Sequence, residues 1–253
     1  MTRMTVGVSL KAYFGRAQAL DWFARVAELA GAHPAVRSGA VEVFVAPGYL
    51  HIDSALRAFD GTPVQVAAQD VSAHARGAFT GEVTALDLVE SGVRLAEIGH
   101  AERRRLFHET DEVVAAKTAA ALAEGVAPVL CLGEVGRGDA DSAVADTLAQ
   151  LDDALSGAPD GRVIVAYEPV WAIGAAEPAP ISHITAVTRA VRARLAADPS
   201  RSGSSVIYGG SAGPGLLTSL GDDVDGVFLG RFAHDPSAFQ AVIDEAASAA
   251  GSH

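Results

Sequence analysis

The segment APVLCLGEVGRGDADSAVADTLAQLDDALS, residues 127–156, contains the pattern that decides the fold. An apolar run at 127–132 is followed by a polar loop and then by an alanine-rich stretch of helical period at 141–156. The first run predicts a β-strand and the second an α-helix. The strand-like run is apolar throughout, which is typical of a strand covered on both faces in a parallel sheet with helices outside.

The same unit recurs along the 253 residues. Strand-like runs lie at 5–10, 41–46, 64–68, 94–98, 127–132, 162–167, 205–208 and 226–229. Helical stretches follow near 16–30, 51–58, 84–91, 111–124, 141–156, 182–196, 213–220 and 236–249. Eight such units predict an α/β protein with a closed (β/α)₈ barrel, and we expect a single domain over residues 1–253. A doubly wound open sheet is the alternative, but no G-x-G-x-x-G follows the first run.

Two helix starts carry local capping residues. Thr110 precedes Asp111 and Glu112, which suits the first turn of the helix at 111–124. Ser182 is expected to cap the helix at 182–196.

The charge balance excludes several classes of partner. With 19 basic and 31 acidic residues, the net charge is −12, so we expect no binding to nucleic acid or to anionic membranes. No run of 18 apolar residues appears, and the first residues lack the apolar stretch of a secretory signal. We therefore expect a cytoplasmic protein.

Metal and disulfide chemistry are not expected. Cys131 is the one cysteine, so an internal disulfide is impossible and a cysteine-based zinc site is excluded. The eight histidines are scattered without paired spacing, and His108 and Glu109 are expected at the surface after the fourth strand. Cys131 itself suits a buried core position.

Polar residues and glycine pairs close several strands. In a parallel barrel the chemistry belongs at these carboxyl ends, where Lys11, His100, Glu168 and the turn Gly209-Gly210 would converge. Taken alone, each residue also suits an ordinary structural position such as a surface charge or a tight turn. Together they fit a phosphorylated substrate, since a lysine and glycine amides hold phosphate while a carboxylate and a histidine move protons beside a carbonyl.

Five segments, in this order along nearly the whole chain, resemble the triosephosphate isomerase family. They are GAFTGE at 77–82, IGHAERR at 98–104, CLGE at 131–134, AYEPVWAIG at 166–174 and YGGS at 208–211. The resemblance implies a TIM barrel and an isomerase that works through an enediol without a cofactor.

The resemblance also implies a role for each catalytic residue. Glu168 would be the base that moves a proton between adjacent carbons. His100, as a neutral imidazole, would polarise the carbonyl. Lys11 would stabilise the enediolate and attract the phosphate, with Glu102 beside it.

Binding and assembly follow from the same resemblance. Amides around Gly174, Ser211 and Gly230 would hold the phosphate, and residues 169–179 would form a lid that excludes water. The 77–82 loop would build a homodimer by placing Thr80 beside Lys11 and His100 of the partner.

Several positions depart from the family pattern. Ser9 stands where the family usually has asparagine, Ala101 replaces its usual serine, and Arg231 replaces the second glycine of the strand-8 phosphate turn. The lid reads AAEPA at 175–179 instead of TGKTA.

The changes at Ser9 and Ala101 open room beside the reacting carbons, where a four-carbon sugar carries an extra hydroxymethyl group. We therefore expect the erythrulose-phosphate isomerase branch of tetritol catabolism, converting L-erythrulose 1-phosphate to D-erythrulose 4-phosphate. An ordinary triosephosphate isomerase is one alternative, and a barrel that binds sugar phosphates without turning them over is another.

Overall fold

Eight parallel strands close into a barrel in the computed structural model, which describes residues 3–251. The strands are β1 (Met4–Ser9), β2 (Val41–Ala46), β3 (Gln65–Ala68), β4 (Leu95–Ile98), β5 (Ala127–Leu132), β6 (Ile164–Tyr167), β7 (Ser205–Tyr208) and β8 (Gly226–Leu229). Each strand pairs with the next, and β8 returns to β1 with Thr5 opposite Gly226. The predicted barrel is confirmed, each predicted strand lies within two residues of its observed bounds, and the open sheet is ruled out.

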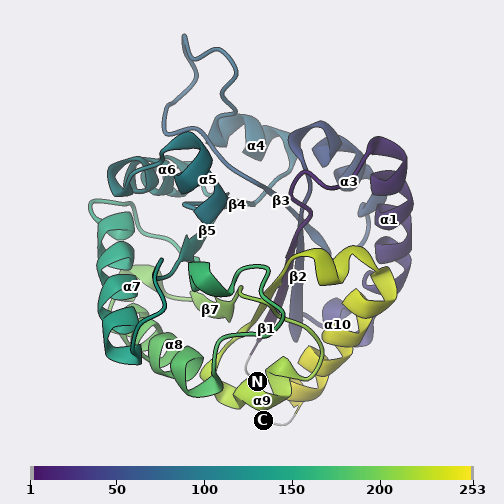
Figure 1. Cartoon of the computed structure of the whole chain (residues 1–253). Helices are drawn as coiled ribbons and strands as arrows, with labels where there is room; N and C mark the ends of the chain where they lie inside the picture. Colours follow the sequence, from purple (N-terminus) through teal and green to yellow (C-terminus); the bar gives the residue numbers. More distant parts are fainter. Residues whose placement is uncertain (1–2, 252–253) are drawn as a thin grey trace.

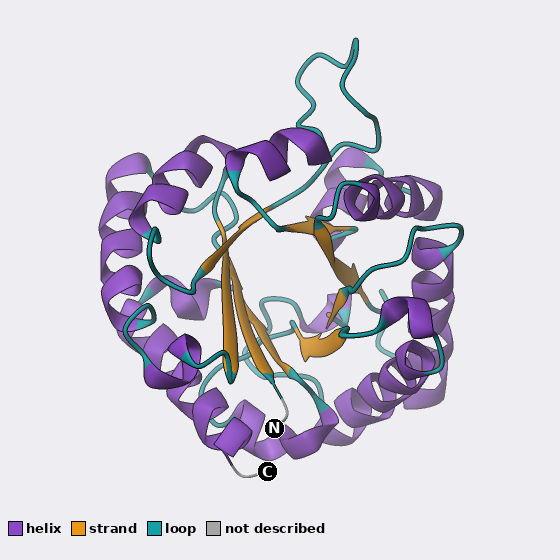
Figure 2. Cartoon of the chain, turned by 180° about the vertical axis from the view of Figure 1, so that it is seen from behind, coloured by secondary structure: helices purple, strands orange, loops and turns teal. Residues whose placement is uncertain are grey.

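A ring of helices surrounds the strands (Figures 1 and 2). The helices are α1 (Arg16–Leu29), α2 (Pro34–Arg37), α3 (Ile52–Ala58), α4 (Ala85–Ser91), α5 (Ala101–Phe107), α6 (Asp111–Ala123), α7 (Ala140–Leu155), α8 (Ile181–Ala196), α9 (Leu216–Leu220) and α10 (Pro236–Gly251). Short 3₁₀ turns lie at Tyr49–His51, Val170–Ala172, Pro199–Arg201, Gly221–Asp223 and Arg231–His234. None of the helices within residues 3–251 is long and apolar enough to cross a membrane.

The predicted helices need four corrections, the first being that the short helix α2 was not expected. Helix α8 begins at Ile181 after Pro180, which makes no side-chain cap, so the expected cap by Ser182 is wrong. Helix α9 begins only at Leu216, and α5 was not expected at all. The cap by Thr110 is confirmed, since its side chain accepts a hydrogen bond from the amide of Val113.

The side chains inside the barrel differ in polarity along its axis. Its middle is filled by apolar side chains such as Leu95, Val129 and Phe228. At the carboxyl ends of the strands the corresponding positions are polar, with Ser9 closing β1 and Glu168 following β6. The apolar layers separate this end from the amino end, where Glu42 is paired with Arg162, so among the described residues the unpaired carboxyl oxygens inside the barrel lie at the carboxyl ends.

The loop between β3 and α4 extends well beyond the ring of helices (Figures 1 and 2). Residues 74–82 are exposed, and the ring of Phe79, 42% exposed, stacks on His74 with 4.1 Å between ring centroids. The projecting loop therefore carries a stacked aromatic pair at its exposed tip.

Candidate active site

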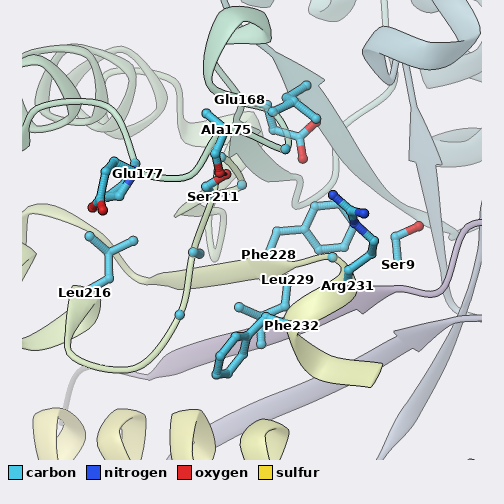
Figure 3. Close-up of a pocket in the computed structure, with 18 of the residues that line it drawn as sticks. Ser9, Glu168, Ala175, Glu177, Ser211, Leu216, Phe228, Leu229, Arg231 and Phe232 are labelled. Carbon is cyan, nitrogen blue, oxygen red and sulfur yellow. The ribbon is translucent and has the colours of Figure 1, made fainter. Parts of the chain in front are cut away.

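A cavity of about 830 Å³ opens at the carboxyl ends of the strands. Nine of the predicted site residues line it, namely Ser9, Lys11, His100, Glu102, Glu168, Gly174, Ser211, Gly230 and Arg231. Figure 3 shows Ser9 and Arg231 on one side of this cavity, the lid residue Glu177 on the other, and Glu168 beside Ala175 between them. Ala101 and Thr80, which were also predicted, lie outside the lining: Ala101 begins α5, and Thr80 lies on the projecting loop.

His100 is held in one orientation by the helix that follows it. Its Nδ1 accepts a hydrogen bond of 3.1 Å from the amide of Glu102, which makes His100 the N-cap of α5. A ring nitrogen that accepts carries no proton, so in the neutral imidazole the proton is on Nε2. Burial, reinforced by the charge of Lys11, lowers the pKa of His100 to about 4. At neutral pH, His100 therefore presents the N–H group of an uncharged imidazole to the cavity.

Glu168 faces this donor. Its Oε2 lies 3.5 Å from Nε2 of His100, and this buried oxygen has no hydrogen-bond partner among residues 3–251. Burial raises the pKa of Glu168 to about 8, although the charge of Lys11 opposes the rise. A carboxyl with a pKa near the working pH and a free oxygen is suited to take up and return a proton.

Lys11 supplies the positive charge of the site. Its Nζ donates a hydrogen bond of 3.0 Å to Glu102, and this contact raises the pKa of Lys11 even though burial acts against it. The backbone of Lys11 has φ +48°, a left-handed conformation that is costly for a residue with a side chain. Gln69 donates to the carbonyl oxygen of Lys11 at 3.0 Å and helps to hold this turn. The ammonium is thus fixed at the cavity wall.

The turn after β7 requires glycine for reasons of space. A Cβ on Gly209 would lie 2.5 Å from Cγ of Glu168, and a Cβ on Gly210 would lie 2.1 Å from the hydroxyl oxygen of Tyr208. Both distances are shorter than any that real Cβ atoms show to neighbouring atoms. A side chain at either position would therefore force the neighbouring residue to move. The pair is therefore part of the site and more than a tight turn.

The segment at 169–179, the predicted lid, is held at its start and in its middle. At its start, Glu134 accepts hydrogen bonds from Tyr167, from the Trp171 indole at 2.8 Å and from His183 at 3.0 Å. Ser211 Oγ donates to the carbonyl oxygens of Ala172 and Ala175 at 3.1 and 2.7 Å. In this conformation the Ser211 hydroxyl is hydrogen-bonded to the lid. The backbone amide of Ser211 is therefore the group that this residue can offer to an anion.

Arg231 brings a second cation to the cavity. Its side chain lies beside the ring of Tyr13, 6.0 Å from the ring centroid, and beside the lid, with one guanidinium nitrogen 4.0 Å from the Cβ position of Gly174. Figure 3 shows the guanidinium pointing into the cavity. A guanidinium here can meet an anionic group with two parallel hydrogen bonds.

Sequence reasoning missed one buried carboxyl at this end of the barrel. Glu97 on β4 is 3% exposed, and its pKa is raised to about 8 by burial, with a hydrogen bond from Ser9 acting in the opposite direction. The signal was visible: an acidic residue interrupts the otherwise apolar run LAEI.

Comparison with known proteins gives a consistent result. A model of the triosephosphate isomerase family matches residues 4–246. The L-erythrulose-1-phosphate isomerase of Pectobacterium atrosepticum is 50% identical over 248 residues, which cover 96% of each chain. The triosephosphate isomerase of Leifsonia xyli subsp. xyli is 41% identical over 214 residues, covering 81% of this chain and 83% of its own. That of Symbiobacterium thermophilum is 37% identical over 218 residues, covering 83% of this chain and 85% of its own.

The predicted resemblance is confirmed by the matched residues, and the closed barrel with a lysine, a histidine and a glutamate around one cavity agrees with it. The chain belongs to the triosephosphate isomerase family.

Proposed function

We propose that this isomerase moves the carbonyl group of a four-carbon phosphorylated ketose by one carbon, converting L-erythrulose 1-phosphate to D-erythrulose 4-phosphate. The observation that carries the proposal is the pairing of Glu168 with His100 across 3.5 Å, beside a cavity wall that has Ser9 in place of the family's usual asparagine. The 50% identity to an L-erythrulose-1-phosphate isomerase supports the same substrate.

Proton transfer follows from the geometry. The Glu168 carboxylate removes the proton from the carbon that bears the hydroxyl, and Nε2–H of His100 donates to the neighbouring carbonyl oxygen. Glu168 returns the proton to the carbon that carried the carbonyl, and the hydroxyl on the first carbon gives its proton to Nε2 of His100. The imidazole is thereby restored and the carbonyl is displaced by one position. Lys11 stabilises the negative charge that develops on the oxygens during both transfers.

The phosphate is held at the opposite side of the cavity. The backbone amides near Gly174, Ser211 and Gly230 surround this region, and Arg231 adds a guanidinium. Closure of the lid at 169–179 over the phosphate would exclude water and protect the enediol from losing its phosphate.

The active form is proposed to be a homodimer joined through the 77–82 loops. The loop projects from the barrel and exposes Phe79, so it can reach a second copy of the chain. Thr80 would then lie beside Lys11 and His100 of the partner. An enzyme of this specificity would serve erythritol catabolism in the cytoplasm, whereas an ordinary triosephosphate isomerase would serve glycolysis.

A coupled assay that compares L-erythrulose 1-phosphate with dihydroxyacetone phosphate on the same protein tests the proposal. We expect a higher kcat/KM for the four-carbon ketose. A kcat/KM of about 10⁸ M⁻¹s⁻¹ for dihydroxyacetone phosphate would instead identify an ordinary triosephosphate isomerase. Proton exchange from the ketose in deuterated water separates both enzymes from a barrel that only binds its ligand, since only an enzyme exchanges the proton.

A further inference from the structure

The second buried carboxyl, Glu97, lies inside the barrel directly under the cavity. On β4 the side chain of Leu95 packs in the apolar interior, so Glu97, two residues further along the strand, faces the same way. On β1, Val8 belongs to the outer core and Ser9 lines the cavity. The two polar side chains therefore face the same end of the barrel from strands that are not neighbours, and the Ser9 hydroxyl is close enough to Glu97 to act on the pKa of its carboxyl.

The fold itself gains little from this carboxyl. Both Glu97 and Ser9 are 3% exposed, and Oε1 of Glu97 is buried without a hydrogen-bond partner among the described residues. An unpaired buried polar atom costs stability, whereas an apolar side chain of similar size would extend the layer below. A group that is costly to the fold and lies next to the reacting residues is typical of a functional role.

The surroundings indicate what the role is. In addition to burial, the charges of Glu168, Lys11 and Glu102 shift the pKa of Glu97. Burial and, after it, the charges of Glu168 and Glu97 in turn raise the pKa of Cys131, so these groups lie close together. Glu97 does not line the cavity itself; Ser9 does, so any effect on a ligand passes through the Ser9 hydroxyl. The Ser9 hydroxyl can donate one hydrogen bond and accept others. The position of Glu97 beside it therefore determines whether the hydroxyl donates to the ligand or accepts from it.

We propose that Glu97 is a positioning residue for substrate choice, which orients the Ser9 hydroxyl to receive the terminal hydroxyl group of a four-carbon sugar phosphate. The inference rests on the proposed four-carbon substrate and names the residues that recognise the extra hydroxymethyl. A triose has no group at this point, so the Ser9–Glu97 pair stays incompletely hydrogen-bonded when a triose binds. Sites built to hydrogen-bond a substrate hydroxyl reject analogues that lack it.

The test compares kcat/KM for L-erythrulose 1-phosphate and for dihydroxyacetone phosphate in the wild-type protein and in Glu97→Leu, Glu97→Gln and Ser9→Ala. Glu97→Leu should reduce the four-carbon preference by about 10–100-fold and change triose turnover by less than about 3-fold. Glu97→Gln keeps the shape and the hydrogen-bonding capacity and should retain most of the preference. In the double variant Ser9→Ala/Glu97→Leu, the second change should add little, because the two residues act as one unit.

Stability measurements separate positioning from a structural role. Removing an unpaired carboxyl should leave the thermal midpoint of Glu97→Leu equal to or above that of the wild type. Glu42→Gln is the matched control, because this buried glutamate lies at the other end of the barrel, paired with Arg162. It should lower stability and leave the substrate ratio unchanged.

The outcomes are distinct. Three results would overturn the role of Glu97, even if the wild type prefers the four-carbon ketose. They are an equal loss of kcat/KM on both substrates, an unchanged ratio of the two kcat/KM values, and effects of Ser9→Ala and Glu97→Leu on that ratio that multiply. A wild-type protein that prefers the triose would overturn the proposed function, and this inference would fall with it.

Discussion

Nε2 of His100 lies 3.5 Å from Oε2 of Glu168, although the two residues follow strands β4 and β6, which are not neighbours in the barrel. Both side chains are buried, and the amide of Glu102 fixes the histidine from behind. A small ketose placed over this pair meets a proton donor at its oxygen and a proton acceptor at its carbon.

Shortening the base should slow catalysis more than it weakens binding. Glu168→Asp withdraws the carboxylate by one methylene, and we expect kcat to fall by about 10²–10³-fold while KM changes little, because the carboxylate acts mainly in the transition state. Steady-state kinetics on the preferred ketose provides the measurement. A variant that keeps most of its turnover would remove Glu168 from the role of base.

The pH profile should show one titration on its acid side. Glu168 must be ionised to act as base, and its pKa is about 8, so kcat/KM should rise with pH through that value and then level off. His100, with a pKa of about 4, stays neutral throughout this range, and the raised pKa of Lys11 keeps its ammonium charged. The assay should run from pH 7 upward, where the phosphate of the substrate is already a dianion. A kcat/KM that is already constant from pH 7 upward would contradict the prediction.

Restoring the bulk that this family usually carries should shift selectivity toward the triose. Ser9→Asn narrows the cavity wall, and one group of this size is worth about 10–200-fold in the ratio of the two kcat/KM values. Ala101→Ser serves as the paired comparison, because Ala101 lies outside the cavity lining and should contribute much less. If Ala101→Ser alone accounts for the shift, Ser9 is not the discriminating residue.

Arg231 should act on the phosphate end of the substrate. Arg231→Ala should raise KM by about 10-fold and weaken inhibition by inorganic phosphate to a similar degree, since a hydrogen bond to a charged group is worth about 1.5–3 kcal/mol. Arg231→Lys should recover part of the loss, because it keeps the charge but not the paired donors. Unchanged inhibition by phosphate in Arg231→Ala would assign the guanidinium to another role.

The projecting loop should be needed for both assembly and activity. Light scattering on the wild type should give about twice the chain mass of 25.8 kDa. Thr80→Arg should shift the protein to monomers and reduce kcat, whereas Ala145→Arg, at an exposed position of α7, should change neither. A fully active monomer at assay concentration would refute the proposed dimer.

The strands and the main site residues could be predicted because their signals are local. Each buried strand is a short apolar run, and the polar residue that ends it must lie at the open end of a parallel barrel. Helix α5 could not be predicted in this way, since AERRRLF has no apolar stripe and the helix depends on its cap by His100.

Burial of single charges was also beyond the sequence. Glu109 was expected at the surface, but it is 8% exposed because Lys117 and Arg103 reach it from α6 and α5. Arg103 and Lys117 are only six and eight residues from Glu109, but the contact depends on the turn that joins α5 to α6, which the sequence pattern did not reveal. For Glu97 the neighbour is remote, because Ser9 comes from a strand that is not adjacent in the barrel.

The cavity is divided by origin: Ser9, Lys11 and His100 come from the first half of the chain, while Gly174, Ser211 and Arg231 come from the second. Glu168, the base, also comes from the second half, so the division concerns the two ends of the substrate and not the reaction itself. In evolutionary terms, we therefore expect a new sugar to be admitted mainly by changes on β1 and β4, with the lid and the anion site kept. For protein engineering, this makes the first hundred residues the part to randomise when a longer ketose phosphate is the target.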